Sequence, residues 1–393
     1  MGIAPEYAFG CVKGRRREEA ISVQLINMER LRRARIGYAT LFFDVKNAFP
    51  SLGHIALEGF FSHCKDGDCQ LFEVFLENHI SVVECLDGAL VLALKRGVPP
   101  GASTATQLFN RGYWKATEKY VGQVGSATRL LLTSSVVTQQ PINTASTCFV
   151  DDLATCVPLP GFRGAKAKIQ QCTSALDEAL RDIGVVQNSD KREALLLFLG
   201  QGSRQAMRQL TWESQALFKQ QARYLGPHLQ WRGLVSPEVT RRVSAARSAW
   251  WAYRRFWFAR CDFDFKILVF RAVVASTLCS GLVALVLSDA HYHRLDVALF
   301  AYLRKLLAGK ACAKEGEASQ GVRYKALSNA RVTQLSMVCS SRVELCVQRL
   351  GMLQSCFRQP QQHQLYLTAL LGSYEFENVA GGHAWSFAFP ASC

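Results

Sequence analysis

The chain has 393 residues, and its 46 lysines and arginines against 31 aspartates and glutamates leave a formal net charge of +15. Because 49% of the residues are hydrophobic and 20% are charged, collagen-like and wholly disordered chains are excluded, and the length predicts two or three domains. The positive charge favours a polyanionic partner, since each lysine or arginine placed against a phosphate releases a counterion. Charge alone leaves nucleic acid and anionic lipid both open.

The 14 cysteines indicate free thiols in a reducing, intracellular compartment, either nucleus or cytoplasm. The first residues, MGIAP, lack the apolar segment of a signal peptide. Two groups of cysteine and histidine also lack the paired spacing of a zinc site: His63, Cys64 and Cys69, and Cys339, Cys346, Cys356 and His363.

One apolar run, residues 267–287, has the length of a membrane-spanning helix. It contains Arg271, and an arginine placed in hydrocarbon costs about 2.5 to 3.5 kcal/mol. We therefore expect a helix buried in protein, with no transmembrane segment and no membrane partner.

Strands and helices alternate in the first part of the chain. Residues 37–45 form an apolar, aromatic-rich run that predicts a buried strand ending in a carboxylate. Two helices are expected around residues 54–63 and 70–79. A hairpin is expected over residues 81–96, where Asp87-Gly88 favours a tight turn.

The elements that follow are expected in this order: a helix capped by Ser103, a hairpin over residues 147–157 with Asp151 and Asp152 at its tip, an amphipathic helix over residues 165–183 closed by Gly184, and a buried strand over residues 194–199. Strands broken by helices, with hairpins among them, predict an α+β domain up to about Trp231.

Long helical patterns follow Pro237, and residues 241–260 interleave arginines with aromatic residues. An aromatic stripe at helical spacing is more often core than a platform for stacked bases, so we expect core positions for its tryptophans. Residues 308–321 are small and charged and predict a linker, and the Gly- and Ala-rich stretch from residue 380 predicts a frayed end.

Three aspartates stand at expected strand ends or turn tips: Asp44, Asp151 and Asp152. Taken alone, an aspartate pair usually only makes a turn. If the fold brings the three together, however, their repulsion calls for a cation, and hard oxygen ligands select Mg²⁺. Two such ions can activate a hydroxyl nucleophile and stabilise a leaving pyrophosphate.

Five short segments carry a resemblance, and they occur in family order: residues 43–52 (FDVKNAFPSL), 97–101 (GVPPG) continuing to 110, 149–152 (FVDD), 184–193 (GVVQNSDKRE) and 224–226 (YLG). Together they resemble the motifs of the reverse transcriptases of non-LTR, LINE-like retrotransposons, with the N-terminal end cut short. A weaker similarity to the thumb of these enzymes continues through residues 266–281 and 295–307.

The resemblance implies an α+β right-hand polymerase fold, whose palm combines an antiparallel sheet with helices. Its parts are expected at residues 1–36 (partial fingers), 37–235 (palm with fingers elements), 236–307 (helical thumb) and 308–393 (helical C-terminal extension). The implied activity is RNA-directed DNA synthesis, with an RNA template, a DNA primer and dNTPs as partners. The oligomeric state stays open.

The resemblance also implies roles for individual residues. Asp44, Asp151 and Asp152, with the carbonyl of Val45, would hold two Mg²⁺ ions, with Mn²⁺ as a substitute, and Lys191 would act as a proton donor or as a charge partner of pyrophosphate. Nucleotide binding is expected of Arg15, Asn47, Ala48, Phe49 and Gly101, and contact with primer or nucleic acid of Tyr224, Leu225, Gly226, Arg241 and Arg247.

Some of these residues also have ordinary structural interpretations. Phe49 matches the bulky residue that excludes a ribose 2′-hydroxyl, and otherwise would be a core phenylalanine. Arg15 lies in a charge run that otherwise would be solvated, and Lys191 otherwise would be a surface lysine.

The sequence departs from the family pattern at Pro100, Ala105 and Thr106, where the family has glutamine, serine and proline. An alternative function is therefore a catalytically decayed relative that still binds nucleic acid. A third possibility, an RNA-dependent RNA polymerase, is disfavoured by Phe49.

Overall fold

The computed structural model describes residues 4–57, 80–85, 88–93, 97–98, 105–200, 202–213, 218–318, 321–376 and 385–386. The chain divides into two compact units. Unit 1 comprises Met1–Leu225, Trp231–Gly233 and Gln359–Cys393, and unit 2 comprises Gly226–Gln230 and Leu234–Arg358.

Unit 1 is built on a five-stranded sheet with the order β6-β7-β1-β8-β9. The central strand, β1 (Gly37–Phe43), is buried along its whole length, as expected for seven residues without a charge. Its neighbours β7 (Asp152–Leu159) and β8 (Glu193–Leu197) are both antiparallel to it. The strand β6 (Ser146–Phe149) pairs antiparallel with β7, and β9 (Phe218–Lys219) is parallel to β8. The strands expected at residues 37–45, 147–157 and 194–199 are thereby confirmed.

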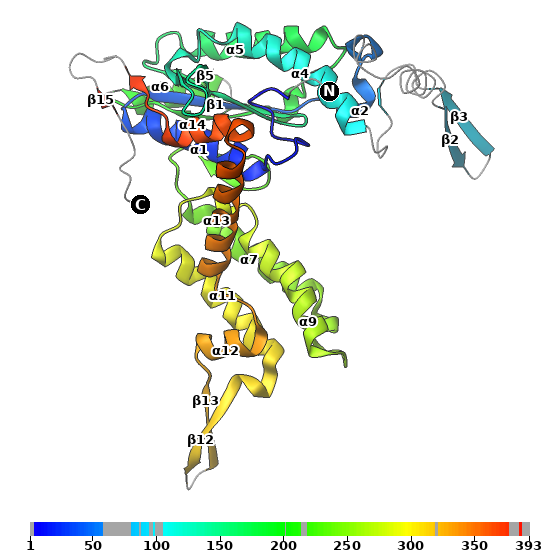
Figure 1. The fold of residues 1–393 in the computed structure, drawn as a ribbon, viewed down its shortest axis with the longest axis vertical. Helices are drawn as coiled ribbons and strands as arrows, with labels where there is room; N and C mark the ends of the chain where they lie inside the picture. The colour runs from blue at the N-terminus through cyan, green and yellow to red at the C-terminus, as the bar shows by residue number, and fades with distance from the viewer. Residues whose placement is uncertain are drawn as a thin grey trace. The chain divides into compact units, whose positions relative to one another are not determined.

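Helices cover both faces of this sheet, with α4 (Ala105–Gln123) and α5 (Ala165–Arg181) over one face and α1 (Arg17–Arg33) and α14 (Gln364–Leu371) over the other (Figure 1). In α5 the expected apolar stripe is buried, and Gly184, with φ of +73°, follows the helix as expected. Burial of these stripes against the sheet removes apolar surface from water and supplies the main stabilisation of unit 1.

The remaining elements of unit 1 include two shorter helices, α2 (Ala48–Ser51) and α6 (Ser203–Glu213). The expected hairpin is confirmed as β2 (Ile80–Cys85) and β3 (Gly88–Ala93). Two further pairs are β4 (Leu132–Ser134) with β5 (Pro141–Asn143), and β14 (Glu375–Phe376) with β15 (Trp385–Ser386); β10 spans Gln221–Arg223. Of the helices expected around residues 54–63 and 70–79, the structure describes only a 3₁₀ turn at His54–Leu57, and the rest lies outside the described residues together with Ser103.

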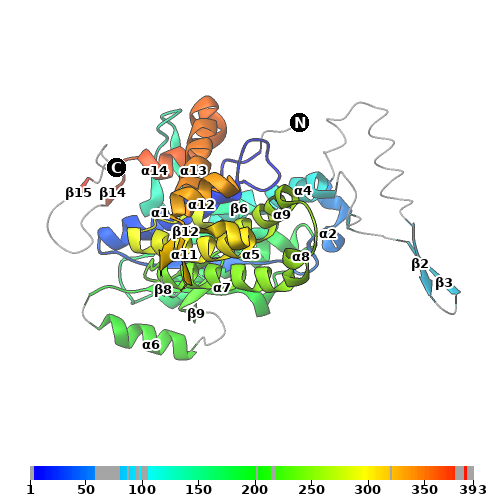
Figure 2. The same cartoon turned by 90° about the horizontal axis from the view of Figure 1, so that it is seen from below.

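Unit 2 is mainly helical and contains β11 (His228–Gln230) and seven α-helices within its described residues: α7 (Ser236–Ala252), α8 (Arg254–Phe258), α9 (Phe263–Phe270), α10 (Ser276–Cys279), α11 (Asp289–Leu307), α12 (Asn329–Ser336) and α13 (Ser341–Arg358). Helix α11 lies between α7 and α12 (Figure 2). The buried ring of Trp250 stacks on Trp257 and Tyr302, so two tryptophans of the arginine-rich segment are core as expected, whereas Trp251 is half exposed.

Two expectations about chain organisation need correction here, the apolar run as one helix and the linker. The apolar run 267–287 is broken by a π-helical turn at Arg271–Ala275 and by Gly281, which has φ of +73°. No helix among the described residues is both long and apolar enough to cross a membrane. Residues expected as a linker form instead the hairpin of β12 (Cys312–Ala318) and β13 (Gly321–Ala326), because strand pairing satisfies the main chain without needing an apolar core.

The C-terminal region also differs from the single extension expected over residues 308–393. Its first part, through Arg358, belongs to unit 2, whereas the chain from Gln359 returns to unit 1. There Arg30 of α1 donates hydrogen bonds to the carbonyls of Ala369 and Leu370 and lies over the ring of Tyr374. These buried polar contacts between segments more than 300 residues apart are not visible in a local sequence pattern.

Candidate active site

The three predicted aspartates meet at one end of the central sheet. The last pair in the register of β1 and β7 is Phe43 with Leu153, so the same register places Asp44 opposite Asp152. Asp151 precedes Asp152 in the turn that joins β6 to β7. Two chain segments far apart in sequence therefore contribute carboxylates to one site, which we call the aspartate cluster.

The turn that carries Asp151 is strained. Phe149 pairs with Asp152, which leaves Val150 and Asp151 as the two central residues of the hairpin turn. Val150 has φ of +60°, a left-handed conformation that a β-branched residue rarely adopts. A strained residue at a site of this kind persists only if its surroundings hold it in place.

Residues 5–10, which we call the bracing segment, hold this turn from one side. The N–H of Phe9 donates to the carbonyl of Cys148, and the N–H of Cys148 donates to the carbonyl of Tyr7, both at 2.7 Å. Gly10 lies so close that a Cβ atom there would be 2.3 Å from the main-chain nitrogen of Val150. Only glycine fits this contact.

Helix α4 holds the same structure through one polar face. Asn110 Nδ2 donates to the carbonyl of Gly10 at 3.1 Å, and the hydroxyl of Tyr113 donates to the carbonyl of Asp151 at 3.2 Å. One turn further on, the hydroxyls of Thr117 and Tyr7 lie 3.3 Å apart. Sequence reasoning missed these positioning residues, although polar and aromatic side chains at positions 110, 113 and 117 have helical spacing.

The carboxylates of the cluster disfavour one another's charge. Burial, followed by the charges of Asp151 and Asp44, raises the pKa of Asp152 to about 6. Burial also raises the pKa of Asp151, and Asp44 adds to that rise. Lys191 opposes both shifts and Arg223 opposes the shift of Asp152. Half-buried carboxylates whose charge is poorly compensated are suited to hold a hard divalent cation.

The direction of the Val45 carbonyl follows from the hydrogen bonds of its neighbours in the chain. The carbonyl of Asp44 accepts from the N–H of Asn188, and the N–H of Lys46 donates to the carbonyl of Val186. The residues before and after Val45 therefore bond to residues 186–188 in an antiparallel bridge. Because main-chain groups of successive residues in such a pair face opposite edges, the N–H and carbonyl of Val45 face the other edge, toward β7. The carbonyl expected to help hold a metal therefore points toward the strand that begins at Asp152.

Asp44 also has polar neighbours of its own. Lys191 Nζ lies 3.2 Å from Asp44 Oδ2, and Asn188 Nδ2 donates to the same oxygen at 3.1 Å. The Lys191 side chain is 70% exposed, so this ion pair contributes little stability and can be exchanged for another partner. The structure thus brings Lys191 to the aspartate cluster.

The residues expected to bind nucleotide lie just beyond Asp44. Asn47 has φ of +49° and precedes α2, which Ala48 begins. Phe49 is half-buried, and its ring centroid lies 5.1 Å from that of Phe109 in α4. The main-chain carbonyl of Phe49 accepts from the N–H of Val98, which belongs to the segment 97–101. Gly101 itself lies outside the described residues.

Arg15 is engaged by protein rather than turned to an open site. Its guanidinium donates to four main-chain carbonyls, those of Pro5, Glu6, Ala8 and Gln362. Burial lowers the pKa of Arg15, and the charges of Glu19 and Glu6 oppose that shift. Nucleotide binding by Arg15 stays a prediction.

The residues expected to contact primer are partly buried. Tyr224 is 3% exposed, its hydroxyl lies 2.8 Å from that of Thr147 in β6, and its ring packs on Phe42. Leu225 and Gly226 follow it with φ of +51° and +116°, which marks a sharp turn. In this structure Tyr224 packs against β6 and β1, the strands next to the aspartate cluster. A contact with nucleic acid by this segment stays a prediction.

The two arginines expected to contact nucleic acid in unit 2 differ in their surroundings. Arg247 is exposed, whereas Arg241 donates to Glu238 and to the carbonyl of Gly226. Glu238 is almost fully buried and also accepts from Arg242. Contact of either arginine with nucleic acid stays a prediction.

We expect Glu238→Gln to destabilise the folded chain by about 3 to 5 kcal/mol, because the change leaves the buried Arg242 without a full counter-charge. Burial acts to raise the pKa of Glu238, but the Arg241 side chain, the His228 amide and the Arg242 charge lower it overall. The ion pairs therefore stabilise the fold above the ordinary glutamate pKa and are lost as pH falls through the lowered value. Urea unfolding at several pH values measures both effects; a variant equal to the natural chain at neutral pH contradicts them.

No known family model and no curated protein sequence matches this chain. Two solved structures are similar to it at 12% sequence identity. The telomerase from Candida albicans, in complex with a TWJ fragment of telomeric RNA, aligns over 76% of this chain and 53% of its own with a TM-score of 0.42. The apo telomerase from Candida tropicalis aligns over 92% of this chain and 57% of its own with a TM-score of 0.44. This chain thus spans little more than half the length of either protein.

Proposed function

We propose that this chain is an RNA-directed DNA polymerase of the reverse transcriptase class, from a non-LTR retrotransposon, that adds dNTPs to a primer 3′-hydroxyl. The observation that carries the proposal is the aspartate cluster. The sheet brings Asp44, at the end of one strand, against Asp151 and Asp152 at the start of the next, at a strained turn that the bracing segment and α4 hold in place. Three carboxylates gathered at a strand end are costly unless they bind cations.

The donor set of the cluster suits two Mg²⁺ ions, or Mn²⁺ in their place, because every group is a hard oxygen. Asp44, Asp151 and Asp152 would hold the ions with the carbonyl of Val45. When bound, the ions supply a lowered pKa for the primer hydroxyl and positive charge for the leaving pyrophosphate. Lys191, whose exposed Nζ lies 3.2 Å from Asp44 Oδ2, would hold a proton or a negative charge at the edge of the site.

The proposal gives the surrounding elements familiar roles. The sheet of unit 1 with α4 and α5 would serve as palm, residues 1–36 as partial fingers, and α7 to α11 of unit 2 as a helical thumb. Phe49, half-buried against Phe109, would lie under the sugar of the incoming nucleotide and favour dNTPs. A net charge of +15 supports binding of an RNA template and a DNA primer.

The test is primer extension on an RNA template with dNTPs and Mg²⁺, comparing the natural chain with Asp151→Asn. We expect the variant to lose incorporation by at least about 1,000-fold, because it removes a ligand charge needed only when the metal ions are bound. Asp177→Asn, the same chemical change at an exposed position of α5, is the matched control and should retain incorporation. Equal incorporation by the natural chain and Asp151→Asn would falsify the proposed mechanism.

A second candidate is a nucleic-acid-binding protein that keeps the fold without turnover. Two contacts favour this candidate: Lys191 forms an ion pair with Asp44 Oδ2, and Asn188 donates a hydrogen bond to the same oxygen. Both groups compete with a metal ion for that oxygen. This candidate predicts RNA binding that weakens with salt, no incorporation by the natural chain, and no effect of Asp151→Asn on binding.

A further inference from the structure

Arg15 lies where three segments of unit 1 meet. Its Nη1 donates to carbonyls of Pro5, Glu6 and Ala8 in the bracing segment, and its Nε donates to the carbonyl of Gln362 at 2.7 Å. A planar guanidinium with donors on two sides can join such segments, whereas the ammonium of lysine is a compact point charge. The side chain thus ties the bracing segment to the chain that returns from unit 2.

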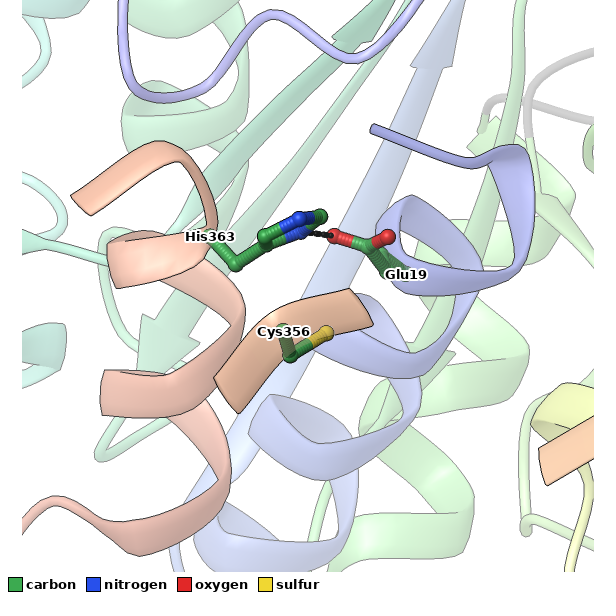
Figure 3. Close-up of side chains that lie close together, drawn as sticks. All are labelled: Glu19, Cys356 and His363. Atoms are coloured by element: carbon green, nitrogen blue, oxygen red, sulfur yellow. Dashed lines mark hydrogen bonds and ion pairs between the residues drawn. The ribbon is translucent and has the colours of Figure 1, made fainter. Parts of the chain in front are cut away.

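The C-terminal side of this contact is itself firmly anchored within unit 1. His363, next to Gln362, is fully buried, and its Nδ1 lies 2.7 Å from Oε2 of the buried Glu19 in α1 (Figure 3). The side-chain Nε2 of Gln364 donates to the carboxylate of Glu6, and the hydroxyl of Ser135 donates to Gln364 Oε1 at 3.3 Å. Residues 359–376, which we call the returning segment, therefore present the Gln362 carbonyl from a fixed position.

The other side of the contact leads directly to the aspartate cluster. Ala8 forms a parallel bridge with Cys148, and Phe9 and Tyr7 exchange hydrogen bonds with the same residue. Gly10 then abuts the main chain of Val150, immediately before Asp151. A shift of the bracing segment therefore reaches the strained turn without any flexible side chain between them.

We infer that Arg15 is a positioning residue for Asp151 and Asp152, acting through the main chain of residues 5–10, rather than a ligand of the nucleotide. The inference rests on the proposed function for what the cluster does, but the bracing itself has a readout that needs no activity. It also makes the returning segment a working part of unit 1. The alternative, direct contact of Arg15 with a triphosphate, makes opposite predictions for each measurement below.

The experiment compares Arg15→Gln and Arg15→Lys with the natural chain, and uses Arg208→Gln on the exposed face of α6 as the matched control. Hydrogen exchange is followed at the amides of Phe9 and Cys148, well below the unfolding temperature. We expect exchange at least about 10-fold faster in both Arg15 variants, since their protection depends on the bracing segment. Exchange unchanged in both variants overturns the inference.

Two kinetic constants separate positioning from phosphate binding. In both Arg15 variants we expect the Mg²⁺ concentration for half-maximal incorporation to rise about 10-fold or more, as when an outer partner of metal ligands is lost. The dNTP KM should stay unchanged, and Arg15→Lys should not restore the natural value. A raised dNTP KM that lysine restores overturns the inference, because a point charge suffices for phosphate. If the natural chain shows no incorporation, the proposed function fails, and hydrogen exchange alone decides whether Arg15 braces the turn.

Discussion

Asp152→Asn is expected to remove incorporation and, at the same time, to make the metal-free protein more stable. Burial and two neighbouring carboxylates raise the pKa of Asp152 from 3.8 to about 6, so its charge destabilises the fold at neutral pH. Asparagine keeps the shape and removes the charge. The expected gain near pH 7.5 is about 1 to 3 kcal/mol, whereas incorporation falls by about 1,000-fold or more.

The pH dependence follows from the direction of the shift. A raised pKa in the folded state means that the folded chain binds the proton more tightly, so stability falls as pH rises from the ordinary aspartate value through about 6. The advantage of the variant is therefore complete well above pH 6 and is lost as pH falls below the ordinary value of 3.8, where Asp152 is protonated in the folded and the unfolded chain alike. Chemical denaturation at both pH values measures it.

Mg²⁺ supplies the complementary measurement. A ligand that binds only the folded state raises stability with its concentration, so Mg²⁺ should stabilise the natural chain and leave the variant unchanged. Asp177→Asn serves again as control, because it removes an exposed carboxylate outside the cluster and should keep both the stability and the Mg²⁺ response of the natural chain. A variant less stable than the natural chain in the absence of metal, at neutral pH, contradicts the account of the site given above.

Gly10→Ala is expected to be nearly as damaging, although the residue lies outside the aspartate cluster. The added Cβ would lie 2.3 Å from Val150 N and 2.8 Å from the carbonyl carbon of Phe149, and both are main-chain atoms that cannot rotate away. The turn must move, at a cost of about 1 to 3 kcal/mol in stability. Because displacement of reacting groups by about 1 Å can cost 100-fold in rate, incorporation should fall by about that factor.

The matched control for this change is Gly122→Ala in α4, where an added Cβ meets open space among the described residues. That substitution should leave incorporation intact and stabilise the helix by up to about 1 kcal/mol, since alanine loses less backbone entropy than glycine. Thermal unfolding and primer extension on both variants provide the comparison. Normal incorporation by Gly10→Ala would show that the turn tolerates displacement.

Much of unit 1 follows from local pattern. The run 37–45, the hairpin around Asp151 and Asp152, and the amphipathic helix 165–183 were each predictable, because apolar spacing and turn chemistry act within a few residues. The β12 and β13 hairpin was not, because its residues are small and charged and are ordered by cross-strand pairing rather than burial. The contacts of Arg15 were not predictable for a related reason: a charge run reveals a cation but not the main-chain carbonyls to which it donates.

What the sequence by itself determined is the chemistry of the candidate site: which aspartates stand at strand ends, in what order, and beside which lysine. Those features depend on residue type and short spacing. Only the tertiary structure decided that Asp44 faces Asp152, that Gly10 abuts Val150, and that a segment beginning at Gln359 returns to meet Arg15. Such contacts join residues more than 100 positions apart, and their free energy comes from pairing and packing that no local segment contains.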